Sequence, residues 1–154
     1  MIDFWQMVLR FLISLALGAL IGLEREKIGK EAGIRTLMII SGGATLFTLA
    51  GLSLPYILSS DNVSEILARN SGFIAIIANI VVGIGFLGGG IIIKNEEHIR
   101  GMTTASVIWF TAGIGILVGI GLIKFAVFCS LLITILLYLT RKLGIIEKLR
   151  QEKR

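Results

Sequence analysis

Charged and hydroxyl side chains stand at the ends of long apolar runs in two segments of the sequence. In the first segment, Glu24 and Arg25 close one apolar run, and Arg35 and Thr36 open the next. A helix start beside an arginine attracts anions through its free amide groups, whereas a carboxylate attracts cations. These residue types in this pattern therefore point to the handling of ions at the ends of helices.

The second segment, IRGMTTAS, repeats the arrangement at residues 99–106. It combines Arg100 and Gly101 with Thr103 and Thr104, and Thr103 is predicted to cap the helix that follows. Pairing of the arginines with nearby glutamates is the structural alternative to a binding role. The middle of the first segment, from Lys27 to Glu31, is interpreted as a replaceable linker.

Glu24 is the acid best placed to bind a metal ion. Apart from Asp61 and Glu65 in a predicted loop, residues 37–93 and 102–140 contain no Asp or Glu. A path for Mg²⁺ needs carboxylates or ordered carbonyl groups that replace tightly held water. We expect no resident cofactor, with Mg²⁺ as a transported or sensed ion. No nucleophile stands with a base in a recognisable pattern, so we do not expect an enzyme.

Glycines recur inside the apolar runs with GxxxG spacing, as Gly18/Gly22, Gly85/Gly89 and Gly115/Gly119. Such pairs let two helix backbones approach closely, and packing within one protomer is the simpler interpretation. The segment GIGFLGGG is denser than packing needs, so unwinding of a helix to bind an ion is the alternative. Its glycines are Gly83, Gly85, Gly88, Gly89 and Gly90.

Several polar side chains fall within the apolar runs. Arg10 must either extend to the membrane surface or find a partner, and Asn79 needs hydrogen-bond partners in lipid. We interpret Asn79 as a link between helices, with a ligand site as the alternative. Ser41, Thr45 and Thr48 share one helix face and could line a polar path or bond to their own helix.

The composition requires a membrane around these elements. The 154 residues are 55% hydrophobic with a mean hydropathy of +0.92, and their charges lie between long apolar runs. This predicts an all-α, polytopic membrane protein and argues against nucleic-acid binding. The predicted spans are Phe4–Leu23, Leu37–Leu54 ending at Pro55, Gly72–Ile93, Met102–Ile123 and Phe125–Thr140, with a turn at Gly119, Gly121 and Lys124.

Lysine and arginine counts set the expected orientation. Five spans place the basic residues of 24–36, 94–101 and 141–154 on one side, so the N-terminus is predicted outside and the C-terminus in the cytoplasm. Spans one and two resemble spans three and four weakly, which allows a parallel repeat plus a fifth helix. We divide the chain into a membrane domain, residues 1–140, and a short basic tail, residues 141–154. Five thin spans enclose little volume, so a homo-oligomer is expected.

At GALIGLERE, AGIRT, GIGFLGGGIII and IRGMTTASVIWFTAGIG the chain resembles the membrane domain of the MgtC/SapB family of bacterial inner-membrane proteins. The resemblance covers about half of the chain, in the family's order. It extends the site residues to Gly33 and Trp109. Many members continue into a soluble domain resembling ligand-sensing ACT domains, whereas this sequence stops soon after the fifth span. Leu37 stands where members often have His, and GMTTAS replaces GLTTAA.

The resemblance implies a multi-pass protein of the bacterial plasma membrane that is linked to magnesium homeostasis. It implies either a regulator or accessory factor of another membrane complex, with the F-type ATP synthase as one such partner, or a Mg²⁺ transporter or channel. The arginine–threonine corners add a small-anion channel, similar to fluoride channels, as a lesser alternative. The regulator is our preferred interpretation, because the predicted spans hold so few acids.

Overall fold

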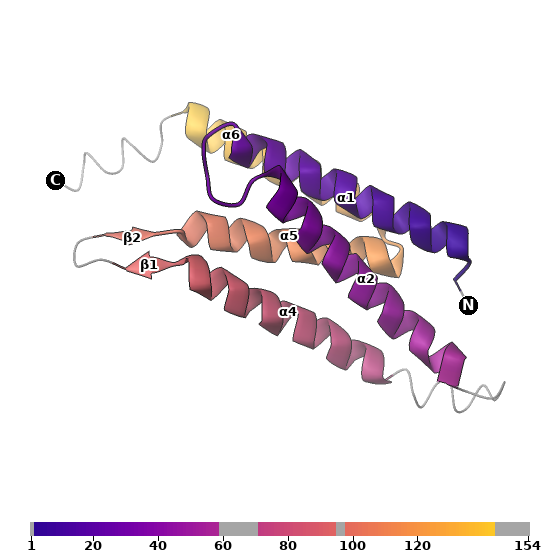
Figure 1. Cartoon of the computed structure of the whole chain (residues 1–154). Helices are drawn as coiled ribbons and strands as arrows, with labels where there is room; N and C mark the ends of the chain where they lie inside the picture. The colour runs from indigo at the N-terminus through magenta and orange to yellow at the C-terminus, as the bar shows by residue number, and fades with distance from the viewer. Residues whose placement is uncertain (1, 59–70, 95–97, 144–154) are drawn as a thin grey trace.

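The computed structural model describes residues 2–58, 71–94 and 98–143, which form five long helices and one short hairpin (Figure 1). Each of these helices is long and apolar enough to cross a membrane. The prediction of an all-α, five-span membrane protein is therefore confirmed. The helices are α1 (Phe4–Glu26), α2 (Ile34–Leu58), α4 (Ser71–Ile91), α5 (Met102–Ile120) and α6 (Ile123–Lys142).

Five helix ends meet at one end of the structure, which we call the charged end. It contains the ends of α1, α4 and α6 and the starts of α2 and α5 (Figure 1). An antiparallel hairpin of β1 (Ile93–Lys94) and β2 (Ile99–Arg100) projects from it. The helix pairs α1–α2 and α4–α5 run in the same direction, as a parallel repeat requires. The repeat and the membrane orientation remain predictions.

The first glycine pair brings α1 and α2 into backbone contact. A methyl group at Gly18 would lie 2.5 Å from the carbonyl oxygen of Leu37, and one at Gly22 would lie 2.5 Å from Cα of Ile34. No side chain fits at either position without moving α2. Packing within the protomer is thus the correct interpretation of this GxxxG pair.

The third glycine pair joins α5 to the hydroxyl face of α2. A methyl group at Gly115 would collide with the carbonyl oxygen of Ser41, and one at Gly119 would lie 2.6 Å from the side chain of Thr48. Thr45 Oγ1 donates to the carbonyl oxygen of Gly115 at 2.7 Å, while Thr48 Oγ1 donates to its own helix. The three α2 hydroxyl residues are fully buried in this contact, so they pack two helices together.

Arg10 finds its partner inside the protein. Its Nη1 donates to the carbonyl oxygen of Gly119 at 2.7 Å, and its guanidinium group packs against Gly121 at the turn between α5 and α6. Gly121 has a φ of 96°, in the left-handed region that glycine adopts most easily. Arg10 is therefore paired inside the protein and does not extend to the membrane surface, because the last turn of α5 offers a carbonyl acceptor within its reach.

The helix boundaries differ from the predicted ones at two places. Helix α2 passes Pro55 and ends at Leu58, because a proline in the last turn of a membrane helix removes only one hydrogen bond. Gly101, with a φ of 86°, stands at the N-cap of α5, and no side chain caps that helix. Thr103 therefore lies inside the first turn, and its prediction as the cap was wrong.

Helix α4 is unbroken through its glycine-rich segment. It continues to Ile91, so Gly88, Gly89 and Gly90 are helical and the proposed unwinding is not found. A continuous helix satisfies most of its backbone polar groups internally, which an apolar surrounding favours strongly. The turn after α5 lies at Gly121 and Leu122, while Gly119 belongs to α5 and Lys124 to α6.

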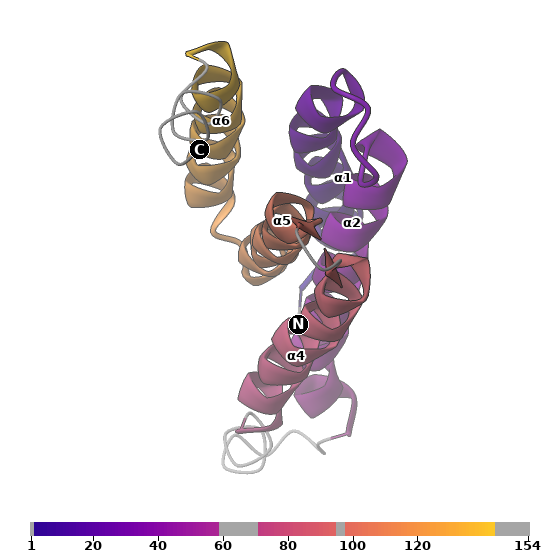
Figure 2. The ribbon, with the colours of Figure 1, turned by 90° about the vertical axis from the view of Figure 1, so that its left-hand side faces the viewer.

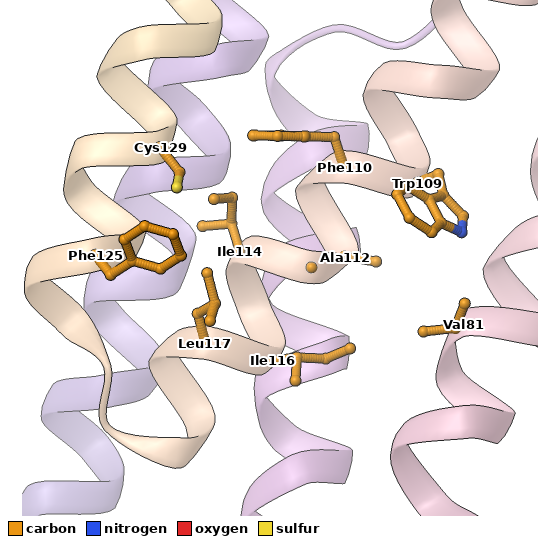
Figure 3. Close-up of a pocket in the computed structure, with 10 residues that line it drawn as sticks. Val81, Trp109, Phe110, Ala112, Ile114, Ile116, Leu117, Phe125 and Cys129 are labelled. Carbon is orange, nitrogen blue, oxygen red and sulfur yellow. The ribbon is translucent and has the colours of Figure 1, made fainter.

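Helix α5 is central, with eleven buried residues among its nineteen. Seen from the charged end, α4 and α6 lie on opposite sides of α5 (Figure 2). Between them is an apolar pocket of about 350 Å³ on the outer face of α5 (Figure 3). Trp109 and Leu117 of α5, Phe125 and Cys129 of α6 and Val81 of α4 line it.

Candidate functional site at the charged end

Helices α1 and α2 bring two oppositely charged neighbours into the interior of the charged end. The side chains of Glu24 and Arg25 are buried, with relative exposures of 7% and 3% for the two residues. They lie within one helical turn after Gly22, whose lack of a side chain lets α1 touch the start of α2. The close helix contact thus places a carboxylate and a guanidinium group where lipid and water are both largely excluded.

Glu26 fixes the start of α2 beside them. Its Oε2 accepts a hydrogen bond from the backbone N–H of Ile34 at 2.8 Å. This satisfies one of the free amide groups of the helix start, and the negative charge suits the helix dipole. A methyl group at Gly33 would collide with this carboxylate, which gives the AGIRT motif a physical reason for its glycine.

Arg25 reaches across to α5 and the first loop. Its Nη2 donates to Thr104 Oγ1 at 3.0 Å, and Thr104 in turn donates to Glu31 Oε2 at 3.3 Å. Arg25 Nε is buried and has no hydrogen-bond partner within the described ranges. A guanidinium group, a hydroxyl group and a carboxylate from three segments therefore form one chain of hydrogen bonds.

The Glu31 carboxyl is exposed, yet its pKa lies below its ordinary value. A hydrogen bond from its own backbone N–H contributes most, followed by the hydroxyl group of Thr104, and Lys30 and Arg25 add attraction. Each of these groups favours the ionised carboxylate. The ionised Glu31 carboxylate therefore places a negative charge at the end of the series of hydrogen bonds that begins at Arg25.

Glu24 faces the other way, toward the end of α6. Its Oε1 lies 3.4 Å from Nη1 of Arg141, whose side chain is 41% exposed and lies 5.3 Å from the centre of the Tyr138 ring. Glu24 Oε2 is buried without a hydrogen-bond partner among the residues that the structure describes. One buried carboxylate thus has one oxygen directed to α6 and one oxygen available to another donor or to a cation.

The structure gathers only part of the predicted site. Glu24, Arg25 and Thr104 come together, whereas Arg35, Arg100 and Thr103 are exposed and take no part in the hydrogen bonds that join Arg25, Thr104 and Glu31. Thr36 is half-buried in the first turn of α2. Gly101 has a structural role, since a side chain there would collide with the carbonyl oxygen of Ile91.

The remaining predicted residues lie along α4 and α5, away from this cluster. Asn79 is exposed on α4, and so are the glycines of the dense segment other than Gly88. Gly88 faces α5, where a methyl group added to it would lie 3.5 Å from Cβ of Ala105. Trp109 lines the apolar pocket and points toward the α4 side in Figure 3. The sequence pattern had grouped these residues by motif, and the fold separates them by helix face.

Two members of the cluster were missed from the sequence. Glu31 lies in the segment interpreted as a replaceable linker, and Arg141 was assigned to the basic tail, whereas α6 continues to Lys142. Only the position of Arg141 in the last turn of a helix gave a signal, because cations favour that end.

Within the described ranges no three His, Cys, Asp or Glu residues come close enough to hold a metal ion. Residues 144–154, Asp61 and Glu65 lie outside those ranges.

Comparison with known proteins gives one consistent result. The profile of the MgtC family matches residues 11–145. Protein MgtC of Salmonella typhimurium LT2 is 37% identical over 126 residues, which make up 82% of this chain and 48% of that protein. YhiD of Escherichia coli K12, named as a proposed magnesium transporter, is 36% identical over 136 residues, 85% of this chain and 60% of YhiD. The chain spans about half the length of the curated relatives it matches, and no solved structure matches it.

Proposed function

The chain belongs to the MgtC family, and from this premise we propose that it is a regulator or accessory factor of magnesium homeostasis in the bacterial plasma membrane. Its family and its five apolar helices make it a multi-pass, magnesium-related membrane protein. The finer role as a regulator, and a membrane complex as its partner, are our proposal. The F-type ATP synthase is the first partner to test.

The carrying observation is that the two buried charges are paired with different segments of the protein. Glu24 is joined to α6 through Arg141, and Arg25 is joined to α5 and the first loop through Thr104. The two residues are neighbours on α1, so a shift of α6 changes the surroundings of the carboxylate directly beside Arg25. Glu24 is buried whereas Arg141 is 41% exposed, so loss of this contact would leave a buried carboxylate without its cation, which disfavours that arrangement.

The tight contacts of the α1–α2–α5 core support this choice over conduction. The backbones of these helices meet at Gly18, Gly22 and Gly115, and the α2 hydroxyl groups are enclosed in the contact. The charged cluster lies at one end of this packed core. This tight packing favours a regulatory role for the charged end over conduction of ions through the core.

Capture of the full chain from native membranes tests the regulator. We expect a tagged wild-type chain, extracted in mild detergent, to retain a membrane complex that an Arg141→Gln variant retains less well. Thr140→Ser, which keeps the neighbouring side chain chemically similar, serves as the matched control. Equal recovery of the complex by wild type and Arg141→Gln, or recovery of none, would contradict the proposal.

Transport of Mg²⁺ is the second candidate, because Glu24 Oε2 is buried and unpartnered within the described part of the chain. This carboxylate oxygen could serve as the one protein ligand of a Mg²⁺ ion, with water and carbonyl groups completing the coordination shell. Purified protein in liposomes should then move Mg²⁺, and Glu24→Gln should abolish the flux. Under the regulator proposal we expect no flux of Mg²⁺, and a fluoride electrode in the same vesicles tests the small-anion alternative.

A further inference from the structure

The apolar pocket between α4, α5 and α6 is a cavity that the proposed function does not use. Its volume of about 350 Å³ lies within the range of about 300–1,000 Å³ that ligand pockets take. None of the described side chains that line it is charged, and none carries a hydroxyl or amide group. An occupant of this pocket must therefore be apolar where it touches the wall.

A glycine leaves part of the pocket unfilled. Gly113 of α5 is one of the lining residues, and a methyl group added to it would meet nothing within 4 Å. Gly115 and Gly119 of the same helix face α2 so closely that an added methyl group would collide there. Because protein interiors are close-packed, the open space beside Gly113 is a place where the described part of the chain leaves contacts unmade.

The pocket is open to the surroundings of the helices. Trp109 and Phe125 line it, yet they are 53% and 55% exposed. Figure 3 shows Phe125 and Cys129 extending from α6 toward α5, with Val81 of α4 on the other side. From Trp109 to Leu117 the pocket follows α5 for about 12 Å. All three helices are long and apolar enough to cross a membrane, so acyl chains are the molecules that surround this opening.

A cation stands at one end of the pocket. Leu117 and Phe125 lie near the turn between α5 and α6, at the opposite end of the helices from the charged end. Lys124 directly precedes Phe125, is exposed and forms no ion pair with another described residue. A lysine near the membrane surface attracts anionic headgroups. The apolar length and the terminal positive charge together are complementary to an anionic amphiphile.

We propose that the pocket binds one acyl chain of an anionic phospholipid, whose headgroup lies at Lys124. The chain supplies the dispersion contacts that are missing beside Gly113, and the phosphate is attracted to the ammonium group. The lipid also gives α6 a packing partner, since Ala126 and Ser130 are its only buried residues in the part of the chain described. The site is independent of the magnesium role, because no residue of the charged end takes part in it.

Quenching of tryptophan fluorescence by brominated phospholipids tests the site in the full chain. In a Trp5→Phe background Trp109 is the one remaining tryptophan, and it lines the pocket. The protein is reconstituted in phosphatidylcholine vesicles with increasing fractions of dibrominated phosphatidylglycerol or dibrominated phosphatidylcholine. We expect a preference of about fivefold for phosphatidylglycerol, so that quenching by this lipid saturates at a lower fraction.

Two variants separate the pocket from the headgroup site. Gly113→Leu fills the pocket and Lys124→Gln removes the charge, and we expect either change to reduce the preference to about one. Gly83→Leu is the matched control, because a methyl group at Gly83 also meets nothing within 4 Å. Gly83 lies two residues after Val81, on the opposite side of α4 from the pocket. This control and Lys124→Arg should keep the wild-type preference.

Equal affinity of wild type for the two lipids would overturn the proposal, and so would a full preference in a Gly113→Leu protein that unfolds at the wild-type temperature. If Gly113→Leu does not fold, an unchanged preference in Lys124→Gln refutes the headgroup site. Protection of Trp109 from both brominated lipids would mean that protein covers the pocket, which also contradicts the proposal. In each case the regulator proposal stands, because its capture experiment measures a different partner.

Discussion

The GxxxG pairs of the packed core and the GxxxG pair of α4 have the same sequence pattern in opposite surroundings. At Gly22 and Gly115, an added methyl group would collide with the backbone of a neighbouring helix, whereas at Gly85 it would enter open space. All of these glycines lie in apolar helices of similar length. The motif thus indicates that backbones can approach, and only the fold decides whether the approaching backbone belongs to the same chain.

Polar side chains divide in the same way. The core formed by α1, α2 and α5 encloses Arg25, Thr104 and the α2 hydroxyl groups, each with a hydrogen bond or a close helix contact. Helix α4 instead presents Asn79 on its exposed face. The core therefore pairs most of its polar groups internally, although Glu24 Oε2, Arg25 Nε and Ser41 Oγ are buried without a hydrogen-bond partner in the described residues. Helix α4 lies at the periphery and leaves Asn79 exposed.

Substitution of Gly115 by alanine gives the largest effect that we predict. The new methyl group collides with the carbonyl oxygen of Ser41, and α2 must move. We expect the free energy of unfolding to fall by about 2–3 kcal/mol, measured by thermal unfolding in detergent micelles. Gly113→Ala on the same helix and Gly85→Ala on α4 meet open space, and we expect changes within about 0.5 kcal/mol for both.

Equal destabilisation by Gly115→Ala and Gly85→Ala would break the comparison between the two glycine environments. It would mean that loss of glycine matters through the helix backbone itself, whatever lies opposite. A strong effect of Gly113→Ala would lead to the same conclusion for α5 alone.

Substitution of Thr104 by valine sharpens the polar half of the comparison. Valine keeps the shape of threonine but removes the acceptor of Arg25 Nη2, so a buried guanidinium nitrogen loses its hydrogen bond. We expect a loss of about 1–3 kcal/mol in the free energy of unfolding. Thr103→Val, one residue earlier and exposed, should stay within about 0.5 kcal/mol. Matching losses from the two variants would show that Thr104 contributes through helix propensity and not through Arg25.

The fold was largely predictable because hydropathy is summed over a whole span. About twenty apolar residues identify a membrane helix even when its ends are wrong by a few positions. The ends themselves depend on single groups, and those predictions failed. Pro55 is accommodated in the last turn of α2, and Gly101 takes the cap position that we assigned to Thr103.

The candidate site was predictable only where the sequence places its members beside a helix end. Glu24, Arg25 and Thr104 were identified in this way. Glu31 and Arg141 join them through the relative placement of the first loop, α5 and α6, which depends on how closely α1 approaches α2. No local spacing contains that information, because the contacts join residues 73 and 117 positions apart, from Glu31 to Thr104 and from Glu24 to Arg141.

The smallest predicted effect concerns Glu31, the exposed member of the charged end. Its pKa is held below the ordinary value of 4.5, chiefly by its own backbone N–H and then by Thr104, so folding favours the ionised carboxylate. The stabilisation is therefore present above about pH 4.5 and is lost as the pH falls through the lowered pKa.

The Glu31→Gln variant tests this charge. Glutamine keeps the shape of glutamate and can still accept hydrogen bonds, but it has no charge to lose. We expect wild type to unfold at a slightly higher temperature than Glu31→Gln near about pH 7, and the difference to vanish toward about pH 3. In a Thr104→Val background the difference near about pH 7 should shrink, because the ionised carboxylate has lost one of its donors. A gap between wild type and Glu31→Gln that stays constant across this range would show that Glu31 acts by shape alone, and the chain of hydrogen bonds from Arg25 would then end at Thr104.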